Sequence, residues 1–240
     1  MQRYSYCFLI LFLFFVSSVQ AETILERRVS LGGQLTGGNT QVQALHFDFN
    51  LNRNRKWIDE VTVKGSLDQS ANAGTQTQFK AYAAVRYAHS LNKQYYQYYK
   101  LEADHDRFQD INIRLIPTVG VGYWFADEAE FKSMIEGAVG YQREFAMDQS
   151  VTESALLTVS SKLALGQLAN DLNLYAAADD PSNFRLTNIT KFGIKLNEHY
   201  AFKLMLKDEY NNRPAAGVEK NDVTFTTGLQ YSLDETKPES

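Results

Sequence analysis

The sequence predicts an all-β protein: a single transmembrane up-and-down antiparallel β-barrel of twelve strands that follows a cleaved signal peptide. Three observations lead to this prediction. A short apolar run stands near the first residue, apolar and polar residues alternate along the rest of the chain, and aromatic residues gather near every second predicted turn. The composition agrees, because 44% of the 240 residues are hydrophobic and the net charge is only −4. These values exclude disorder and give no basic surface for nucleic acid.

Residues 1–21 have the pattern of a secretory signal peptide. Arg3 precedes an apolar run over residues 6–16, and Ala21 offers a small residue for cleavage. The run is about half of the roughly 20 residues that a membrane-spanning helix needs. The only cysteine, Cys7, lies inside it, so no disulfide is expected in the mature chain. We therefore expect a barrel over residues 22–233 and a polar tail over residues 234–240.

The mature chain alternates with a period of two, which is the signature of strands with two different faces. Over residues 45–52 each odd residue is apolar and each even residue is polar, and the pattern returns in residues 57–68, 79–87, 111–125, 202–210 and 222–233. Two stretches, 127–136 and 153–168, also fit a helical period, and we interpret them as strands. Pro117 falls within a predicted strand, where its missing N–H favours a local bulge.

Eleven clusters of turn-forming residues separate the predicted strands, which gives twelve strands in all. The clusters are residues 37–39, 52–56, 70–74, 91–93, 109–110, 126–129, 146–150, 167–170, 179–183, 197–199 and 211–220.

Alternation alone does not reveal which face of the sheet is buried, because a soluble sandwich hides its apolar face against a second sheet. The export signal, the even strand number and the aromatic residues at strand ends favour a barrel with its apolar face toward lipid. The aromatic residues near the even-numbered turns form the expected interfacial girdle. They are Trp57, Tyr95, Tyr96, Tyr98, Tyr99, Tyr123, Trp124, Phe125 and Tyr200.

Three segments carry a resemblance to a known family. They are SLGGQLTGGNTQVQALHFDFNL at residues 30–51, EADHDRFQDINIRLIPTVGVGYWF at 102–125 and GAVGYQREF at 137–145. With them the chain resembles the YdiY-like family of salt-induced outer membrane proteins, a family with a domain of unknown function. The resemblance implies a β-barrel in a Gram-negative outer membrane and a role in salt or osmotic stress. It brings no catalytic residue, no metal and no cofactor.

One departure concerns the end of the last predicted strand. Barrels of this class finish on an aromatic residue that the barrel assembly machinery recognises, whereas this chain finishes at Leu233 and continues into the tail. The expected partners are outer membrane lipid, the assembly machinery during biogenesis, and small solutes or ions.

The densest polar cluster predicts a charge network inside the barrel. Glu102, Asp104 and Asp106 share one strand face, and Arg114 lies on the polar face of the next strand. Carboxylates opposite a guanidinium form charge-assisted hydrogen bonds that fix the register of two strands. The alternative is a hydrolase, with His105 and Asp106 activating water at the barrel rim.

Charges of both signs are expected on the inner face. The basic residues are Lys64, Lys80, Arg86, Lys100, Arg114, Lys132, Lys162, Lys191, Lys203 and Lys207, and the acidic ones are Asp48, Glu60, Asp68, Glu102, Asp104, Asp106, Glu136, Glu144 and Asp222. His46, His89, His105 and His199 are scattered, so no metal site is expected.

The sequence therefore predicts a non-enzymatic outer membrane barrel that serves as a narrow, porin-like passive channel or in stress adaptation. Twelve strands lie between the roughly eight that side chains fill and the roughly 16 that leave a wide aqueous channel. The alternatives are the hydrolase and a soluble periplasmic β-rich protein that binds a ligand.

Overall fold

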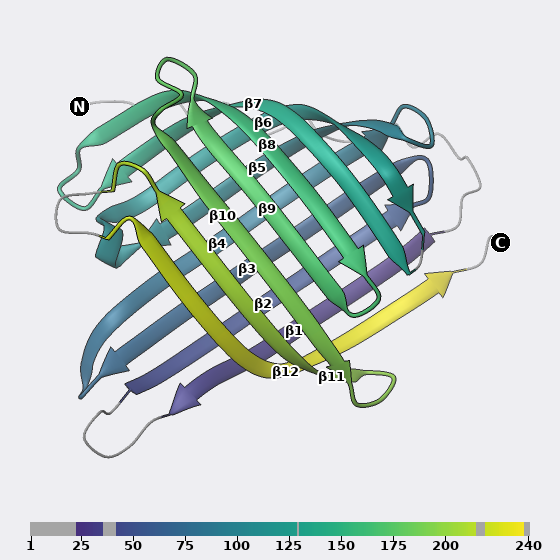
Figure 1. Ribbon diagram of the computed structural model, residues 1–240, viewed down its shortest axis with the longest axis horizontal. Coiled ribbons are helices and arrows are strands. Elements are labelled where there is room, and N and C mark those ends of the chain that lie inside the picture. Colours follow the sequence, from purple (N-terminus) through teal and green to yellow (C-terminus); the bar gives the residue numbers. More distant parts are fainter. Residues whose placement is uncertain (1–22, 36–41, 129, 215–218, 238–240) are drawn as a thin grey trace, which may run out of the picture.

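The computed structural model describes residues 23–35, 42–128, 130–214 and 219–237, and they form a closed barrel of twelve antiparallel strands (Figure 1). The signal peptide predicted for residues 1–21 lies outside the described residues. The strands are β1 Thr23–Leu35, β2 Val42–Arg55, β3 Asp59–Asn72, β4 Thr75–Ser90, β5 Tyr95–Asp106, β6 Ile111–Asp127, β7 Phe131–Ala146, β8 Val151–Leu165, β9 Leu168–Ala177, β10 Phe184–Lys195, β11 Tyr200–Asn211 and β12 Asn221–Lys237. Within the described residues no helix is long and apolar enough to cross a membrane.

Each strand pairs with its neighbours along the chain, and β1 pairs with β12 to close the barrel. The predicted strand number is confirmed. The two stretches that also fit a helical period contain no helix in their described residues: residues 131–136 belong to β7, and residues 153–165 belong to β8. Closure leaves no sheet edge unpaired. Strands can cross the hydrocarbon core of a membrane only in such a closed barrel, because no water is present there to bond an unpaired N–H or C=O group.

The alternation places apolar side chains on the outside of the barrel. Val121 is 61% exposed on β6 and Phe225 is 62% exposed on β12. Other exposed apolar residues on this outer face are Leu31, Leu45, Leu51, Val85, Leu101, Val119, Val139, Leu157, Val159, Phe192 and Leu206. A soluble protein rarely exposes a continuous apolar surface of this extent. The prediction that the apolar face looks outward is confirmed.

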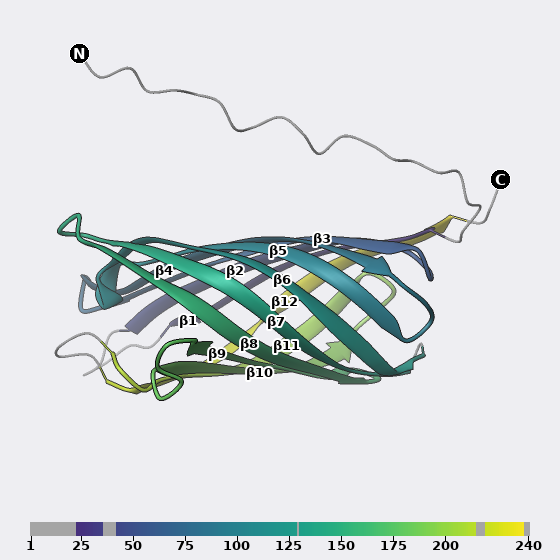
Figure 2. The same ribbon diagram turned by 90° about the horizontal axis from the view of Figure 1, so that it is seen from above.

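The strands cross the long axis of the barrel at a slant, and the start of β1 and the end of β12 lie together at one end (Figure 2). β12 continues to Lys237, which pairs with Thr23. The polar tail that we expected from residue 234 is thus shorter, because residues 234–237 extend the seam between the last strand and the first.

Pro117 causes no bulge, and that expectation is wrong. The register between β6 and β7 is the same on both sides of it, from Leu115 opposite Arg143 to Thr118 opposite Gly140. Proline has no N–H to donate, and here the ladder toward β7 is interrupted at residues 116–117 without a change of register. The irregularities of this strand pair lie elsewhere, between Ile111 and Ile113 and between Trp124 and Ala126.

Candidate functional site in the barrel interior

The polar faces of the strands enclose a cavity of about 870 Å³. Among the described residues, 14 basic and 14 acidic side chains line it. Mixed charge on the inner face is therefore confirmed. The cavity is also lined by charged side chains of β9 to β11 that the sequence prediction did not include, among them Asp171, Arg185 and Glu209.

The predicted network around Arg114 exists as a set of short contacts. The Arg114 guanidinium donates to Asp104, with Nη2 2.6 Å from Oδ1, and Nη1 donates to Glu144 at 3.1 Å. Asp104 and Arg114 are opposite each other in the register of β5 and β6, and Arg114 is opposite Glu144 in that of β6 and β7. One guanidinium therefore joins three consecutive strands.

Glu102 and Asp106 face the interior as predicted, but they bond to other partners. Glu102 accepts from Lys100 at 2.9 Å and from the Tyr82 hydroxyl at 2.7 Å. Asp106 accepts from the backbone N–H groups of residues 108 and 109 and lies 3.5 Å from Lys80 Nζ. The four predicted residues thus belong to three adjoining networks and not to one.

Several of these contacts cross the lumen between strands that are not neighbours. The Tyr175 hydroxyl on β9 donates to Glu102 on β5 at 3.1 Å. Lys80 on β4 lies 2.7 Å from Asp222 on β12 and 3.3 Å from Glu209 on β11. These bridges narrow the lumen without filling it.

The aromatic girdle needs a correction. Tyr96 and Tyr98 are 3% and 1% exposed and face the interior, where Trp124 packs against Tyr96 with its ring centroid 5.9 Å away. The sequence prediction took adjacent residues of one strand as a single girdle, although they point to opposite faces. Residues at positions 96, 98 and 124 share a face with Glu102 and Arg114, so they cannot face lipid.

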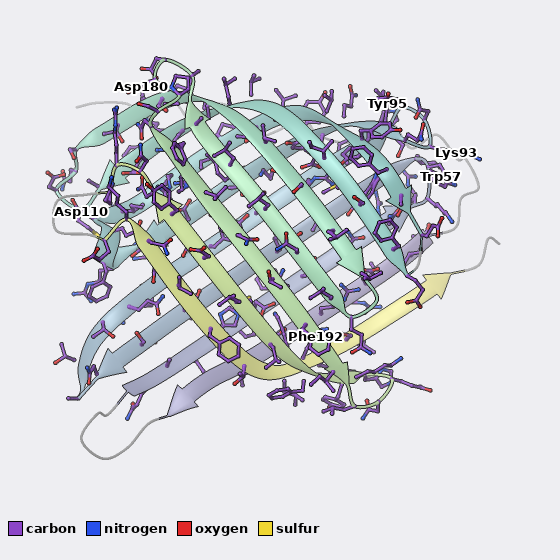
Figure 3. All side chains as sticks on the ribbon, in the orientation of Figure 1. Trp57, Lys93, Tyr95, Asp110, Asp180 and Phe192 are labelled. Atoms are coloured by element: carbon purple, nitrogen blue, oxygen red, sulfur yellow. The ribbon has the colours of Figure 1, made fainter. Side chains whose placement is uncertain are left out.

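The other residues predicted for the girdle are not buried: Trp57, Tyr95, Tyr99, Phe125 and Tyr200 are exposed, and Tyr123 is partly exposed. Tyr123 packs between Tyr95 and Phe125, at centroid distances of 4.9 and 5.0 Å. Lys56 and Lys93 each place an ammonium group within 6 Å of the Trp57 ring. Trp57, Lys93 and Tyr95 lie together at one end of the barrel, and Asp110 and Asp180 lie at the other (Figure 3).

A polar cluster joins two turns at the end that carries Asp180. Asp180 accepts from Ser182 Oγ at 2.5 Å and pairs with Arg213 at 2.7 Å. The Ser182 hydroxyl, and after it the Arg213 guanidinium, lower the pKa of the Asp180 carboxyl below its ordinary value. These contacts hold the β9–β10 turn against the residues that follow β11.

The residues of the hydrolase alternative do not form a pair. His105 lies on the opposite face of β5 from Asp104 and Asp106, its Nδ1 2.6 Å from the carbonyl oxygen of Asn112 and its ring against Phe79. Asp106 caps the short η1 turn, Arg107–Gln109, from the inner face. A base and its orienting carboxylate must share a hydrogen bond, and these two side chains do not.

A different histidine, which was not predicted from the sequence, has the paired geometry. His46 on β2 lies between two carboxylates, with Nδ1 2.5 Å from Asp68 and Nε2 3.0 Å from Asp48. Lys203 Nζ approaches Asp48 at 2.7 Å and the Ser30 hydroxyl at 3.2 Å. The two-residue spacing of His46 and Asp48, which puts them on one face, was the available signal. In the part of the chain that the structure describes, no three or more His, Cys, Asp or Glu side chains are arranged so that they could hold a metal ion.

A comparison of the barrel sequence with known protein families identifies the family of this chain. A family model described as "Protein of unknown function, DUF481" matches residues 29–233. The chain belongs to this family. No curated protein matches it in sequence.

Solved structures similar to this DUF481 protein include the NanC porin in a rhombohedral crystal form. That chain is 12% identical with a TM-score of 0.48, and the match covers 89% of this chain and 99% of that one. The COG4313 outer membrane channel from Pseudomonas putida F1 is 8% identical with a TM-score of 0.48, over 91% of this chain and 97% of that one. The translocator domain of autotransporter NalP from Neisseria meningitidis is 8% identical with a TM-score of 0.39, over 91% and 89%. Likeness at this level does not bear on function.

Proposed function

We propose that this DUF481 protein is a barrel of the bacterial outer membrane and acts as a narrow passive channel for small hydrophilic solutes. The observation that carries the proposal is the contrast between its two faces. Its outer surface is apolar from β1 to β12, and its inner surface encloses a charged cavity of about 870 Å³. A chain with this arrangement is stable in lipid and holds water inside.

The bridges across the lumen support a narrow channel. Long side chains from β4 and β9 reach carboxylates on distant strands, and each bridge divides the cross-section. Porins with roughly 16 strands leave a wide aqueous channel, whereas a barrel of this size leaves a passage that such side chains can constrict.

Single-channel recording tests the activity. The refolded protein in a planar bilayer is expected to give discrete conductance steps well below those of a wide porin. A silent bilayer, with the barrel shown to be folded by its heat-dependent mobility on gels, would remove the channel and keep the barrel.

Fractionation tests the location separately. The protein is expected to sediment with outer membranes, to resist extraction by salt or alkali, and to dissolve only in detergent. Recovery in the soluble periplasmic fraction would contradict the proposal and would favour the alternative of a soluble ligand-binding protein.

A further inference from the structure

Ion pairing inside the barrel is unequal between the two signs. Each acidic side chain that faces the cavity from a described strand has a basic or histidine nitrogen within 4.0 Å. The pairs are Glu26 with Arg28, Asp48 with His46 and Lys203, Asp68 with His46, Glu60 and Glu136 with Arg86, Glu102 with Lys100, Asp104 with Arg114, Asp106 and Asp222 with Lys80, Asp171 with Lys191, and Glu209 with Lys80 and Lys207. Lys195, the last residue of β10, has no acidic group within that distance. Farther inside the described strands the same is true of three cations, Lys64, Lys162 and Arg185.

Two of these three cations lie against aromatic rings. Lys64 on β3 is exposed to the cavity, with its Nζ 5.6 Å from the centroid of the Tyr82 ring. The guanidinium of Arg185 on β10 lies 4.9 Å from the centroid of the Tyr175 ring. A cation–π contact orients a positive group, but it leaves the net charge in place.

The unpaired lysines have Asp171 in common, and each also interacts with a carboxylate that is already paired with another cation: Lys64 with Glu102, and Lys162 with Glu60. Asp171 on β9 interacts electrostatically with Lys64, Lys162 and Lys191, and its direct ion pair is with Lys191 at 3.4 Å. Three ammonium groups around one carboxylate give a local excess of positive charge. Within the low-dielectric wall of a barrel such an excess is offset only by water or by an anion.

Arg185 lies nearer to one opening of the barrel than the lysines do. It is the second residue of β10 and follows the turn that contains Asp180, which marks one end of the barrel in Figure 3. Lys64 lies in the middle of β3. Lys162 lies near the end of β8 that is away from the Asp180 turn, and both lysines interact with Asp171. Arg185 therefore lies toward the opening marked by Asp180, and the two lysines lie farther from it.

We propose that the interior binds small anionic solutes that carry carboxylate, phosphate or sulfonate groups, at Arg185 and then at Lys64 and Lys162, and that the lumen is selective for anions. This inference rests on the proposed channel. Along the strands, a cation meets carboxylates already bonded to basic groups, whereas an anion meets three positive groups with free hydrogen-bond donors. The described cavity-lining acids without such a bond, Glu130, Glu198 and Glu219, lie outside the strands.

The reversal potential across a planar bilayer with a KCl gradient tests the selectivity. The unmodified protein is expected to pass chloride in preference to potassium, and the triple variant Lys64→Glu, Lys162→Glu, Arg185→Glu is expected to reverse the sign. Lys93→Glu, which makes one such change beside Trp57 at the end of the barrel and not in the lining of the large cavity, is the control for each single substitution and should leave the potential unchanged. A cation-selective or unselective channel, or a triple variant identical to the unmodified protein, would overturn the inference.

A chemical measurement separates the anion site from the channel. Ser66 lines the cavity two residues from Lys64, so Ser66→Cys in a Cys7→Ser background places one thiol beside the proposed site. An anionic sulfonate thiosulfonate reagent is expected to label it faster than a trimethylammonium one, and Lys64→Glu should invert that order. Faster labelling by the cationic reagent, or no labelling by either, would contradict the site. Preferential anionic labelling of a protein without conductance would contradict only the channel.

Discussion

The two walls of the lumen differ in how tightly their side chains pack. On β4 to β7 several inward residues are buried, among them Ala84, Tyr96, Tyr98 and Glu136. On β9 and β10, Ala177 is the only residue in the buried class, and the other side chains keep part of their surface open. The closely packed wall fixes the shape of the barrel, and the open wall is where water and solutes have room.

The packed wall depends on tyrosines seated over glycines of the next strand. Tyr96 is opposite Gly122, and Tyr98 is opposite Gly120, in the register of β5 and β6. A Cβ atom on Gly122 would lie 2.2 Å from the Tyr96 ring. Arg86 then stacks on both tyrosines, at 5.4 and 5.0 Å, and donates to Glu136. Ring, glycine and guanidinium thus form one packed unit.

The largest effect is expected from breaking the ion pairs of this unit. Arg86→Met would leave the carboxylates of Glu136 and Glu60 without their guanidinium. Removing one partner of a buried pair costs about 3–5 kcal/mol. Denaturant titration of the refolded protein in detergent should record this loss. The double variant Arg86→Met, Glu136→Gln should recover part of it, and equal stability of Arg86→Met and the unmodified protein would refute the packed unit.

The next largest effect is expected from a side chain added at the glycine beneath the Tyr96 ring. Gly122→Ala should lower the free energy of unfolding by about 1–3 kcal/mol, because the added methyl group overpacks the Tyr96 ring. Gly137→Ala is the matched control, since nothing lies within 4 Å of a Cβ at Gly137. The same titration compares the two variants. Similar losses at both positions would show that strand propensity, and not the tyrosine contact, sets the cost.

A much smaller effect is expected on the open wall. Lys191→Met removes the ion pair with Asp171, in which both side chains are partly exposed. Such pairs contribute about 0–1 kcal/mol. A loss comparable to that of Arg86→Met would mean that the two walls do not differ in stability.

A substitution on the open wall should change the conductance without changing the stability of the barrel. Asn173 faces the cavity from β9 and is not buried, so Asn173→Tyr has room to fit there. We expect an unchanged unfolding midpoint and a smaller single-channel conductance. An unchanged conductance would place the solute path away from β9.

The sequence was sufficient to predict the fold, because each strand carries its own two-residue alternation and each turn its own breaking residues. The charged inner face could be predicted from the same alternation of odd and even positions. The partners of each charge did not, since Tyr175 reaches Glu102 and Lys80 reaches Asp222 across strands that are far apart in the chain. Such contacts depend on the shear of the closed barrel, that is, on how far the strands are staggered around it, and this stagger cannot be read from the sequence alone.

A stricter use of the odd–even alternation would have kept the inward aromatic residues out of the predicted girdle. Tyr95 and Tyr96 are adjacent and must lie on opposite faces, and only Tyr95 is exposed. The inner place of Tyr96 could also have been inferred from Gly120 and Gly122, which leave space for a ring. That step needs the register of β5 and β6, which the sequence alone does not supply.

The seam between β1 and β12 has a consequence for biogenesis. Thr23 pairs with Lys237, so closure joins residues 214 positions apart. Contacts of such sequence separation form slowly, and until they form both margins of the nascent sheet have unsatisfied hydrogen bonds and can associate with other chains. Pairing of β12 with β1 therefore completes the fold, and removal of β12 would leave an open sheet that can associate with other chains, not a slightly smaller barrel.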